Sequence, residues 1–593
     1  MSKVIVFASP LFLLLIAIEF WWSRRVLLKT APSGSSNTLP KVGYRLNDTL
    51  ANLSLGMTSQ LFGVLTRLVL VGIYGAVYNS VALFPDAAIW SSWQGALLAL
   101  VFYDFCYYWQ HRAGHEVAVI WAGHVVHHQS QTFNLGTALR QPSTAFWVGW
   151  IFYLPMAVAG VPPVLFGIVA LVDLLYQFWV HTEYVGKLGW FDRWFCSPSN
   201  HRVHHAVNDG YVDKNYGGIL IIWDRIFGSF REEDVPCIYG TRSQLNSWDP
   251  LWANAEVYWA LWQTSRKLPR WRDKLLVWFK PPGWEPVDMD ARLKKPAFEL
   301  RQVSTFDPPM GPGLMWFSGL NFLALLGGVL AVLWHADDMS FIHAAVWTTA
   351  ISAGMWALGA AMQGRLSPWL VLMVQSAALA TVTSVMGLLQ WHYLFKPLTI
   401  AAAIFYIASY AHSSRPATSN SLRNSLTVWL IAALAFSALG DVLLMLPGNF
   451  FIPGLLAFLI AHLCFIALFR QTTSAARWFP NRVALLCTLL AGAAMFAYVA
   501  PGLRDPVLKA AVAVYALVIS LMAAQAIGRA SVLRTEGALC VAVGAGIFML
   551  SDSLIAINRF VRPIEMSALW VLGTYYTAQV LIVANVLTPP ARQ

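Results

Sequence analysis

The chain has 593 residues and a formal net charge of +11, and 58% of its residues are hydrophobic while only 12% are charged. Soluble domains carry about 25% charged residues, so this composition, with a mean hydropathy of +0.56, excludes an ordinary soluble protein and indicates an all-α, polytopic membrane protein. The positive charge does not indicate a nucleic-acid partner, because the basic residues lie between apolar runs, as in cytoplasmic loops near anionic lipid.

The first apolar run, residues 4–22, is too long for a signal-peptide core and lacks a small-residue cleavage site, so we expect a retained membrane helix. Runs at 56–84 and 89–109 follow, and Gly160-Val161-Pro162-Pro163 divides the next run, 144–180, into a helical hairpin. Residues 183–312 are polar, basic and rich in Trp and Pro, which predicts an ordered cap rather than a linker. About fifteen helices are expected in all, the later ones near 313–334, 341–362, 368–390, 396–411, 425–446, 451–469, 482–500, 507–528, 537–557 and 567–588.

Nine of the 14 histidines lie between His111 and His205. The positive-inside rule, applied from Arg24 and Arg25 after the first helix, places all nine at the cytoplasmic face. Offsets of three and four put side chains on one side of a helix, so two or three imidazoles can converge on one ion. The nine are arranged as His111-x-x-x-His115, His124-x-x-His127-His128, His181 and His201-x-x-His204-His205.

This histidine cluster predicts a metal centre. Neutral imidazole suits iron, zinc, copper and nickel, and nine ligands are too many for one tetrahedral ion but enough for two ions with open positions. None of the six cysteines forms a CxxC pair, so no thiolate site is indicated. Interfacial histidines without metal are the alternative, which the spacing disfavours because adjacent protonated imidazoles repel, whereas ligation keeps them neutral.

The motifs HxxxH, HxxHH and HxxHH, in this order, resemble the membrane fatty acid hydroxylase and sterol desaturase superfamily over residues 95–235. Residues 134–141, 213–218, 223–228 and 280–284 resemble its alkylglycerol monooxygenase branch. The resemblance implies two non-haem iron ions that are held by the nine histidines and that use O₂ to attack an unactivated C–H bond. It also singles out Glu116, directly after the first motif, to orient a ligand histidine; a solvated acid on an interfacial helix is the alternative.

The branch implies a membrane lipid as substrate and an external reductant. Hydroxylation beside the ether oxygen of an alkylglycerol gives a hemiacetal, which collapses to an aldehyde and a glycerol hydroxyl. The branch uses a reduced pterin as electron donor, while other branches use small redox proteins. Because the sequence contains no fused His-Pro-Gly-Gly haem motif, we expect the electron donor to come from outside.

Charged residues inside the later apolar runs are costly and therefore candidates for function. Lys396, Asp441 and Asp552 are three such residues, and His462 lies in the middle of another run. Two carboxylates near a lysine could form an acid/base site or a buried ion-paired brace.

Residues 368–588 resemble the YhhN-type lysoplasmalogenase family, through Lys396-Pro397-Leu398-Thr399, residues 436–441, Ala461-His462, Ser551-Asp552, and Tyr576 with Gln579. That family hydrolyses the vinyl ether bond of lysoplasmalogens and releases an aldehyde. The resemblance makes Asp441 and Asp552 the acid/base candidates, with Lys396 and His462 beside them. A degenerate domain kept for folding is the alternative.

We therefore predict one membrane enzyme that cleaves ether lipids by oxidation in one half and by hydrolysis in the other. Its predicted segments are a di-iron hydroxylase domain with a cytoplasmic cap (1–312), connecting transmembrane helices (313–367) and a lysoplasmalogenase-like membrane domain (368–588). We expect it in a bacterial inner membrane. The alternatives are a sterol, fatty acyl or carotenoid hydroxylase or desaturase, a zinc enzyme without redox chemistry, and a non-catalytic lipid sensor or transporter. No nucleic-acid motif, P-loop or dinucleotide fingerprint supports another class.

Overall fold

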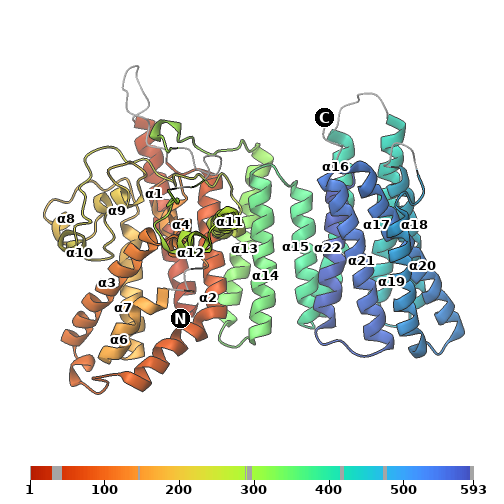
Figure 1. Cartoon of the computed structure of the whole chain (residues 1–593), viewed down its shortest axis with the longest axis horizontal. Coiled ribbons are helices and arrows are strands. Elements are labelled where there is room, and N and C mark those ends of the chain that lie inside the picture. Colours follow the sequence, from red (N-terminus) through yellow and green to blue (C-terminus); the bar gives the residue numbers. More distant parts are fainter. Residues whose placement is uncertain are drawn as a thin grey trace. The chain divides into compact units, whose positions relative to one another are not determined.

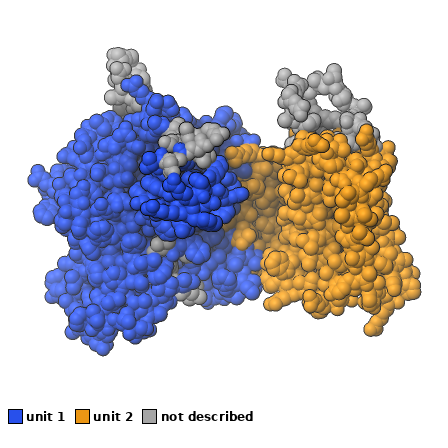
Figure 2. Space-filling model, in the orientation of Figure 1, with its two compact units in different colours: residues 1–348, 358–364 blue, residues 349–357, 365–593 orange. Residues whose placement is uncertain are grey.

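The computed structural model describes residues 2–29, 43–144, 147, 149–287, 289, 297–413, 420–471 and 477–587. Within these residues the chain forms twenty-two α-helices and no β-strand, which confirms the predicted all-α class (Figure 1). It divides into two compact units, residues 1–348 with 358–364 and residues 349–357 with 365–593 (Figure 2).

The first unit contains long helices and, after α7, three short ones, of which α9 carries three of the nine clustered histidines. Its helices are α1 (Ser2–Lys29), α2 (Leu46–Val81), α3 (Trp93–Glu116), α4 (Ala118–His128), α5 (Leu135–Ala138), α6 (Leu154–Ala159), α7 (Pro163–Trp179), α8 (Phe191–Trp194), α9 (Pro198–His205), α10 (Ile222–Ile226), α11 (Pro250–Lys267), α12 (Trp271–Phe279) and α13 (Pro312–His335). Helix α14 (Phe341–Met362) is divided, since its residues 349–357 belong to the second unit.

The second unit is a bundle of long apolar helices. They are α15 (Pro368–Val385), α16 (Leu389–Ser413), α17 (Asn420–Met445), α18 (Phe451–Gln471), α19 (Arg482–Val499), α20 (Pro506–Leu533), α21 (Glu536–Phe560) and α22 (Ser567–Asn585). Its core is a continuous cluster of aliphatic and aromatic side chains, among them Phe465, Phe469 and Phe548, which are fully buried. The predicted end of this region, residue 588, lies outside the described residues.

The protein is an integral, multi-pass membrane protein. Among the described residues, 11 helices are long and apolar enough to cross a membrane, and 12 if the two parts of α2, bent by 45°, count as one span. This number is smaller than the fifteen helices expected, because α6 and α7 are short and because α3 carries Asp104, Gln110 and several tyrosines within its apolar run. The predicted helices before the cap are present, and α3, α6 and α7 are those that fall short of this criterion of length and composition.

The break within residues 144–180 lies where the sequence predicted it. Helix α6 ends at Ala159, Gly160 adopts a left-handed conformation with φ of 92°, and α7 begins at Pro163. A side chain at Gly160 would meet the backbone of Phe84, since a Cβ atom there would lie 2.5 Å from the Phe84 carbonyl carbon. The turn returns α7 along α3, so that residues at the end of α7 reach the histidines.

Candidate metal centre

The nine predicted histidines form two groups of closely spaced ring nitrogens in the first unit. Within each group, one ligand atom per residue lies within 4.8 Å of all the others. The first group is His111, His115, His124, His128 and His204, and the second is His127, His181, His201 and His205. The two groups touch, since the rings of His128 and His205 stack with centroids 4.3 Å apart.

Backbone carbonyl groups fix the orientation of four of these rings. Nδ1 of His111 lies 2.8 Å from the Tyr216 oxygen, and Nδ1 of His127 lies 2.9 Å from the Arg140 oxygen. Nδ1 of His181 lies 2.7 Å from the oxygen of Gln177, and His204 makes the same contact with the Lys214 oxygen at 3.0 Å. A carbonyl can only accept, so each Nδ1 carries the proton and each Nε2 presents a lone pair.

These lone pairs point at one another. Nε2 of His127 lies 3.1 Å from Nε2 of His181, although both rings hold their proton on the other nitrogen. Two lone pairs at this distance repel unless a cation lies between them. A metal–nitrogen bond of about 2.1 Å places two ligands at right angles about 3.0 Å apart. The donor set therefore fits a metal ion in geometry as well as in chemistry.

The spacing in the first group agrees with this reading. Nε2 of His124 lies 3.0 Å from that of His111 and 3.1 Å from that of His128. Among the described residues, Nε2 of His115 and Nε2 of His204 are buried without a hydrogen-bond partner. Buried polar atoms are almost always paired, so these two nitrogens are also available to an ion.

Burial keeps the imidazoles neutral, as ligation requires. Desolvation lowers the pKa of His127 to about 4, despite its hydrogen bond to Arg140. Desolvation, together with the neighbouring imidazoles, lowers the pKa of His128 and His205 well below the ordinary value. The imidazoles of His127, His128 and His205 are therefore uncharged near neutral pH and can take up a cation without first releasing protons.

Two buried carboxylates hold the loop that supports His111. Asp104 on α3 accepts hydrogen bonds from the amides of Ile219 and Leu220 at 2.7 and 3.1 Å and from Trp223 Nε1 at 2.8 Å. Asp224 accepts from the amides at 216 and 217, both at 2.7 Å. The backbone is tightly packed here, because a Cβ atom on Gly217 would lie 2.5 Å from the Leu220 oxygen. This loop presents the Tyr216 carbonyl to His111.

A buried arginine plays the corresponding part for His127. The Arg140 side chain donates to the oxygen of Val126 at 2.6 Å, to Asn52 Oδ1 at 2.9 Å and to Gln129 Oε1 at 3.0 Å. Val126 and Gln129 lie at the end of α4, so the guanidinium group satisfies acceptors at the C-terminal end of that helix. The Arg140 carbonyl accepts a hydrogen bond from His127 Nδ1. Arg140 therefore holds both the end of α4 and the orientation of the His127 ring.

Glu116 lies at the end of α3 and pairs with Arg112 rather than with a histidine. The Arg112 Nε–Glu116 Oε1 distance is 2.9 Å, and the carboxylate side chain is 44% exposed. Among the described residues, the carboxylate near a ligand histidine is that of Asp213, whose Oδ1 lies 3.6 Å from Nδ1 of His115.

The four polar residues predicted in the later helices form two pairs in the second unit. Lys396 Nζ lies 3.2 Å from Asp441 Oδ1, and His462 Nε2 lies 3.5 Å from Asp552 Oδ2. Tyrosines join both pairs. Tyr575 donates to Asp441 Oδ2 at 2.6 Å, and Tyr515 donates to Asp552 and lies 2.9 Å from His462.

The rings between the two pairs are in contact. The Phe548 ring lies 4.8 Å from that of His462 and 5.4 Å from that of Tyr575, measured between centroids. The Phe548 ring therefore packs between a residue of each pair. Sequence reasoning missed Tyr515 and Tyr575; it noted Tyr576 only as part of the family resemblance. A hydroxyl-bearing aromatic ring inside an apolar run is too common to be singled out without the fold.

Comparison with known proteins assigns the two parts separately. The fatty acid hydroxylase family model matches residues 96–229, and the YhhN family model matches residues 391–586. Among solved structures, none matches the chain. Both predicted resemblances are thereby confirmed.

Individual relatives agree with the two family matches. The chain is 38% identical to human alkylglycerol monooxygenase over 281 residues, which are 47% of this chain and 59% of the human protein. It is 36% identical to the alkylglycerol monooxygenase of Danio rerio over 322 residues, or 53% of this chain and 70% of that protein. A lysoplasmalogenase of Mycobacterium tuberculosis is 36% identical over 160 residues, which are 26% of this chain and 59% of that protein. The chain thus spans about six tenths of the human relative and belongs to the alkylglycerol monooxygenase family.

Proposed function

We propose that the chain is a non-haem di-iron monooxygenase that hydroxylates the carbon next to the ether oxygen of alkylglycerol lipids. The observation that carries this proposal is the pair of Nε2 lone pairs of His127 and His181, which face each other at 3.1 Å. Neutral imidazoles alone leave these two lone pairs facing each other, because both rings carry their proton on Nδ1. The similarity to alkylglycerol monooxygenases favours iron over zinc, because a metal ion that activates O₂ must be redox-active and zinc is not.

Each histidine group would hold one iron ion, with five imidazoles around the first and four around the second. Bound iron supplies the activation of O₂ that attack on an unactivated C–H bond requires. The protein residues keep the rings neutral, orient Nε2 towards the ion through the carbonyl contacts, and exclude water by burial. Dry surroundings suit such chemistry, since they prevent loss of a reactive oxidant to solvent.

The proposed reaction consumes one alkylglycerol, one O₂, two electrons and two protons. One oxygen atom enters the C–H bond beside the ether oxygen and the other leaves as water. The resulting hemiacetal breaks its bond between carbon and the glycerol oxygen, which gives an aldehyde and a free glycerol hydroxyl. The electrons come from an external donor, a reduced pterin or a small redox protein.

The test begins with the metal content of the purified full chain. We expect about two iron ions per chain, and fewer in His127→Ala, because that ring is oriented towards the second group by its contact with Arg140. Incubation with an alkylglycerol, O₂ and a reduced pterin should release an aldehyde. A stable alcohol or alkene as product would instead support another hydroxylase or desaturase of the superfamily. Absence of any transition metal, even after anaerobic addition of Fe(II), would refute the oxygenase.

We also propose that the second unit hydrolyses the vinyl ether bond of lysoplasmalogens. The buried pair of Lys396 and Asp441, with Tyr575 on the same carboxylate, supports an acid/base site. Among the described residues, Nδ1 of His462 is buried without a partner and is available to a bound molecule. Asp552→Asn should abolish aldehyde release from a lysoplasmalogen and leave the oxidation of alkylglycerols intact. Equal hydrolysis by this variant would refute the second activity.

We further propose that the functional segments are 1–312, 313–367 and 368–588, in a bacterial inner membrane, with the histidines at the cytoplasmic face. Asp209 offers a test, because its side chain is 80% exposed near the cap. In a Cys487→Ser background, Asp209→Cys should react with a membrane-impermeant thiol reagent in inverted vesicles but not in intact cells. The opposite result would reverse the orientation.

A further inference from the structure

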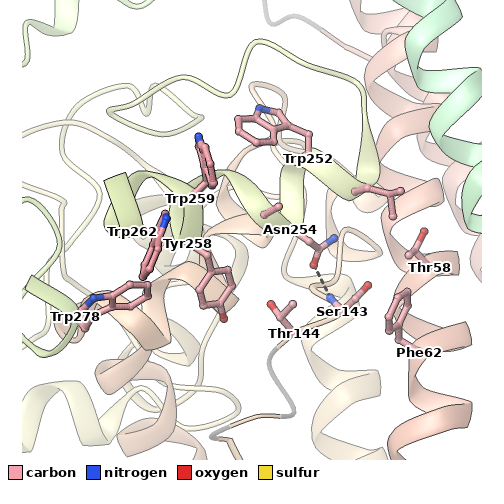
Figure 3. Close-up of a pocket in the computed structure, with 12 residues that line it drawn as sticks. Thr58, Phe62, Ser143, Thr144, Trp252, Asn254, Tyr258, Trp259, Trp262 and Trp278 are labelled. Atoms are coloured by element: carbon pink, nitrogen blue, oxygen red, sulfur yellow. Dashed lines mark hydrogen bonds between the residues drawn. The ribbon is translucent and has the colours of Figure 1, made fainter. Parts of the chain in front are cut away.

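The first unit contains an open groove that no histidine lines. Its volume is about 650 Å³, and its walls come from α2, the segment after Arg140, α11 and α12. Trp252, Trp259, Trp262 and Trp278 lie along it, and Figure 3 shows Phe62 at the end away from Trp278. A pocket of this size suits a small lipid-like molecule, with room for one hydrocarbon chain rather than the two chains of a phospholipid.

The tryptophans of α11 form an exposed stripe. Trp252, Trp259 and Trp262 are 37%, 49% and 48% exposed, and their spacing of seven and three residues places them on one side of the helix. Exposed tryptophans on a membrane protein are typical of the level of the lipid headgroups. A lipid molecule can therefore reach this groove directly from the bilayer.

One end of the groove has a polar feature that hydrocarbon does not satisfy. Ser143 is only 8% exposed, and among the described residues its hydroxyl oxygen has no hydrogen-bond partner. Its amide donates to Asn254 Oδ1 at 2.8 Å (Figure 3), and Asn254 Nδ2 donates to the Pro250 oxygen at 2.9 Å. Asn254 is thus fixed by its own contacts, which leaves the Ser143 hydroxyl to a bound molecule.

The chemistry of the lining limits the occupant. The twelve residues that line the groove include no aspartate, glutamate, lysine, arginine or histidine. A charged headgroup placed there would lose its hydration without gaining a counter-charge. A single chain with a small uncharged headgroup that carries hydroxyl groups satisfies both the apolar walls and Ser143.

Helix α11, which lines the groove, contacts the end of α4, which carries histidines of the metal centre. Gln129, directly after His128, donates to the Ala253 oxygen on α11 at 3.1 Å, and Ala253 packs with Val126 of α4. Helix α4 carries histidines of both groups. The groove thus adjoins the helix that supports both proposed metal sites, although no ligand histidine opens into it.

We propose that this groove binds a single-chain alkylglycerol, with the chain along the tryptophans and a glycerol hydroxyl at Ser143. The choice of an ether lipid rests on the proposed function. The single chain follows from the volume of the groove, and the uncharged headgroup follows from its lining. The groove would collect the lipid substrate from the bilayer beside the catalytic centre.

A photoreactive alkylglycerol, with a diazirine in its chain, tests the proposal on the purified full chain under anaerobic conditions without reductant. We expect saturable labelling on peptides that contain residues 250–262. Ala255→Trp, which fills the groove at an exposed lining position, should reduce labelling at least tenfold. Trp271→Ala is the matched control, because Trp271 is 77% exposed on α12 and does not line the groove.

Ser143→Ala tests the headgroup contact. Loss of one neutral hydrogen bond should weaken competition by unlabelled alkylglycerol about fivefold, and a fatty acid of the same chain length should compete about tenfold less well because of its charge. Unchanged competition in Ser143→Ala, or full labelling of Ala255→Trp, would overturn the proposal. Labelling needs no turnover, so a chain that binds the probe here but never oxidises alkylglycerol would refute the proposed function and not the groove.

Discussion

Asp104→Asn should weaken the binding of one iron ion before the other. An asparagine oxygen in the place of Oδ2 keeps the bonds from Leu220 and Trp223, but its amide nitrogen then faces the amide of Ile219. Loss of one hydrogen bond to a charged group costs about 1.5–3 kcal/mol. If that cost falls on the loop that holds His111, affinity for the first ion drops about 10- to 100-fold.

Iron retention against a graded chelator measures this effect. The variant should retain about two iron ions without chelator and about one at a concentration that leaves the unaltered chain fully loaded. Asp209→Asn is the matched control, since this exposed carboxylate pairs with Arg242 at the surface and contributes little. Parallel loss of both ions, or retention of both, would refute the argument that the loop carried by Asp104 supports the first group alone.

Three other variants test the packing and the second site. Gly217→Ala should lower iron content to about one ion per chain and alkylglycerol oxidation at least tenfold, because its Cβ would lie 2.5 Å from the Leu220 oxygen; metal analysis of the purified variant checks this. Lys396→Met leaves Asp441 buried without its cation, so thermal unfolding in detergent should show a loss of about 3–5 kcal/mol in the second unit. Tyr575→Phe should lower lysoplasmalogen hydrolysis about tenfold with alkylglycerol oxidation unchanged, since it removes the hydrogen bond to Asp441; an aldehyde assay with each substrate distinguishes the two activities.

The sequence predicted that the histidines meet, and helix periodicity explains why. The pairs His111/His115, His124/His128 and His201/His205 are each four residues apart, and each pair falls within one group. Sequence alone could not assign His127 and His204 to a group, since each is directly adjacent to a member of one of these pairs. His127 joins the second group and His204 joins the first, because adjacent residues on a helix point about 100° apart and the packing of α4 on α9 decides which ion each meets.

The residues that support the rings were harder to predict. Four rings depend on backbone carbonyls, which have no signature in the sequence. Asp104 did carry a signal, since a carboxylate within the apolar run 89–109 is costly unless it is paired. Glu116 lies beside His115 in the sequence, but its side chain pairs with Arg112, so its role in orienting a histidine stays a prediction.

The distribution of histidines over the helices explains why a selective loss of one ion is expected at all. Helices α4 and α9 each contribute rings to both groups, whereas α3 serves only the first group and His181 only the second. A change that moves α4, such as loss of the Arg140 side chain that holds its C-terminal end, must therefore disturb both ions together. A change on α3 acts directly on the rings of the first group and reaches the second group indirectly, through the hydrogen bond of Tyr107 to Gln177, whose carbonyl holds His181. Asp104 therefore lies closer to the supports of the first group than to those of the second, which is why its loss is expected to release the first ion before the other.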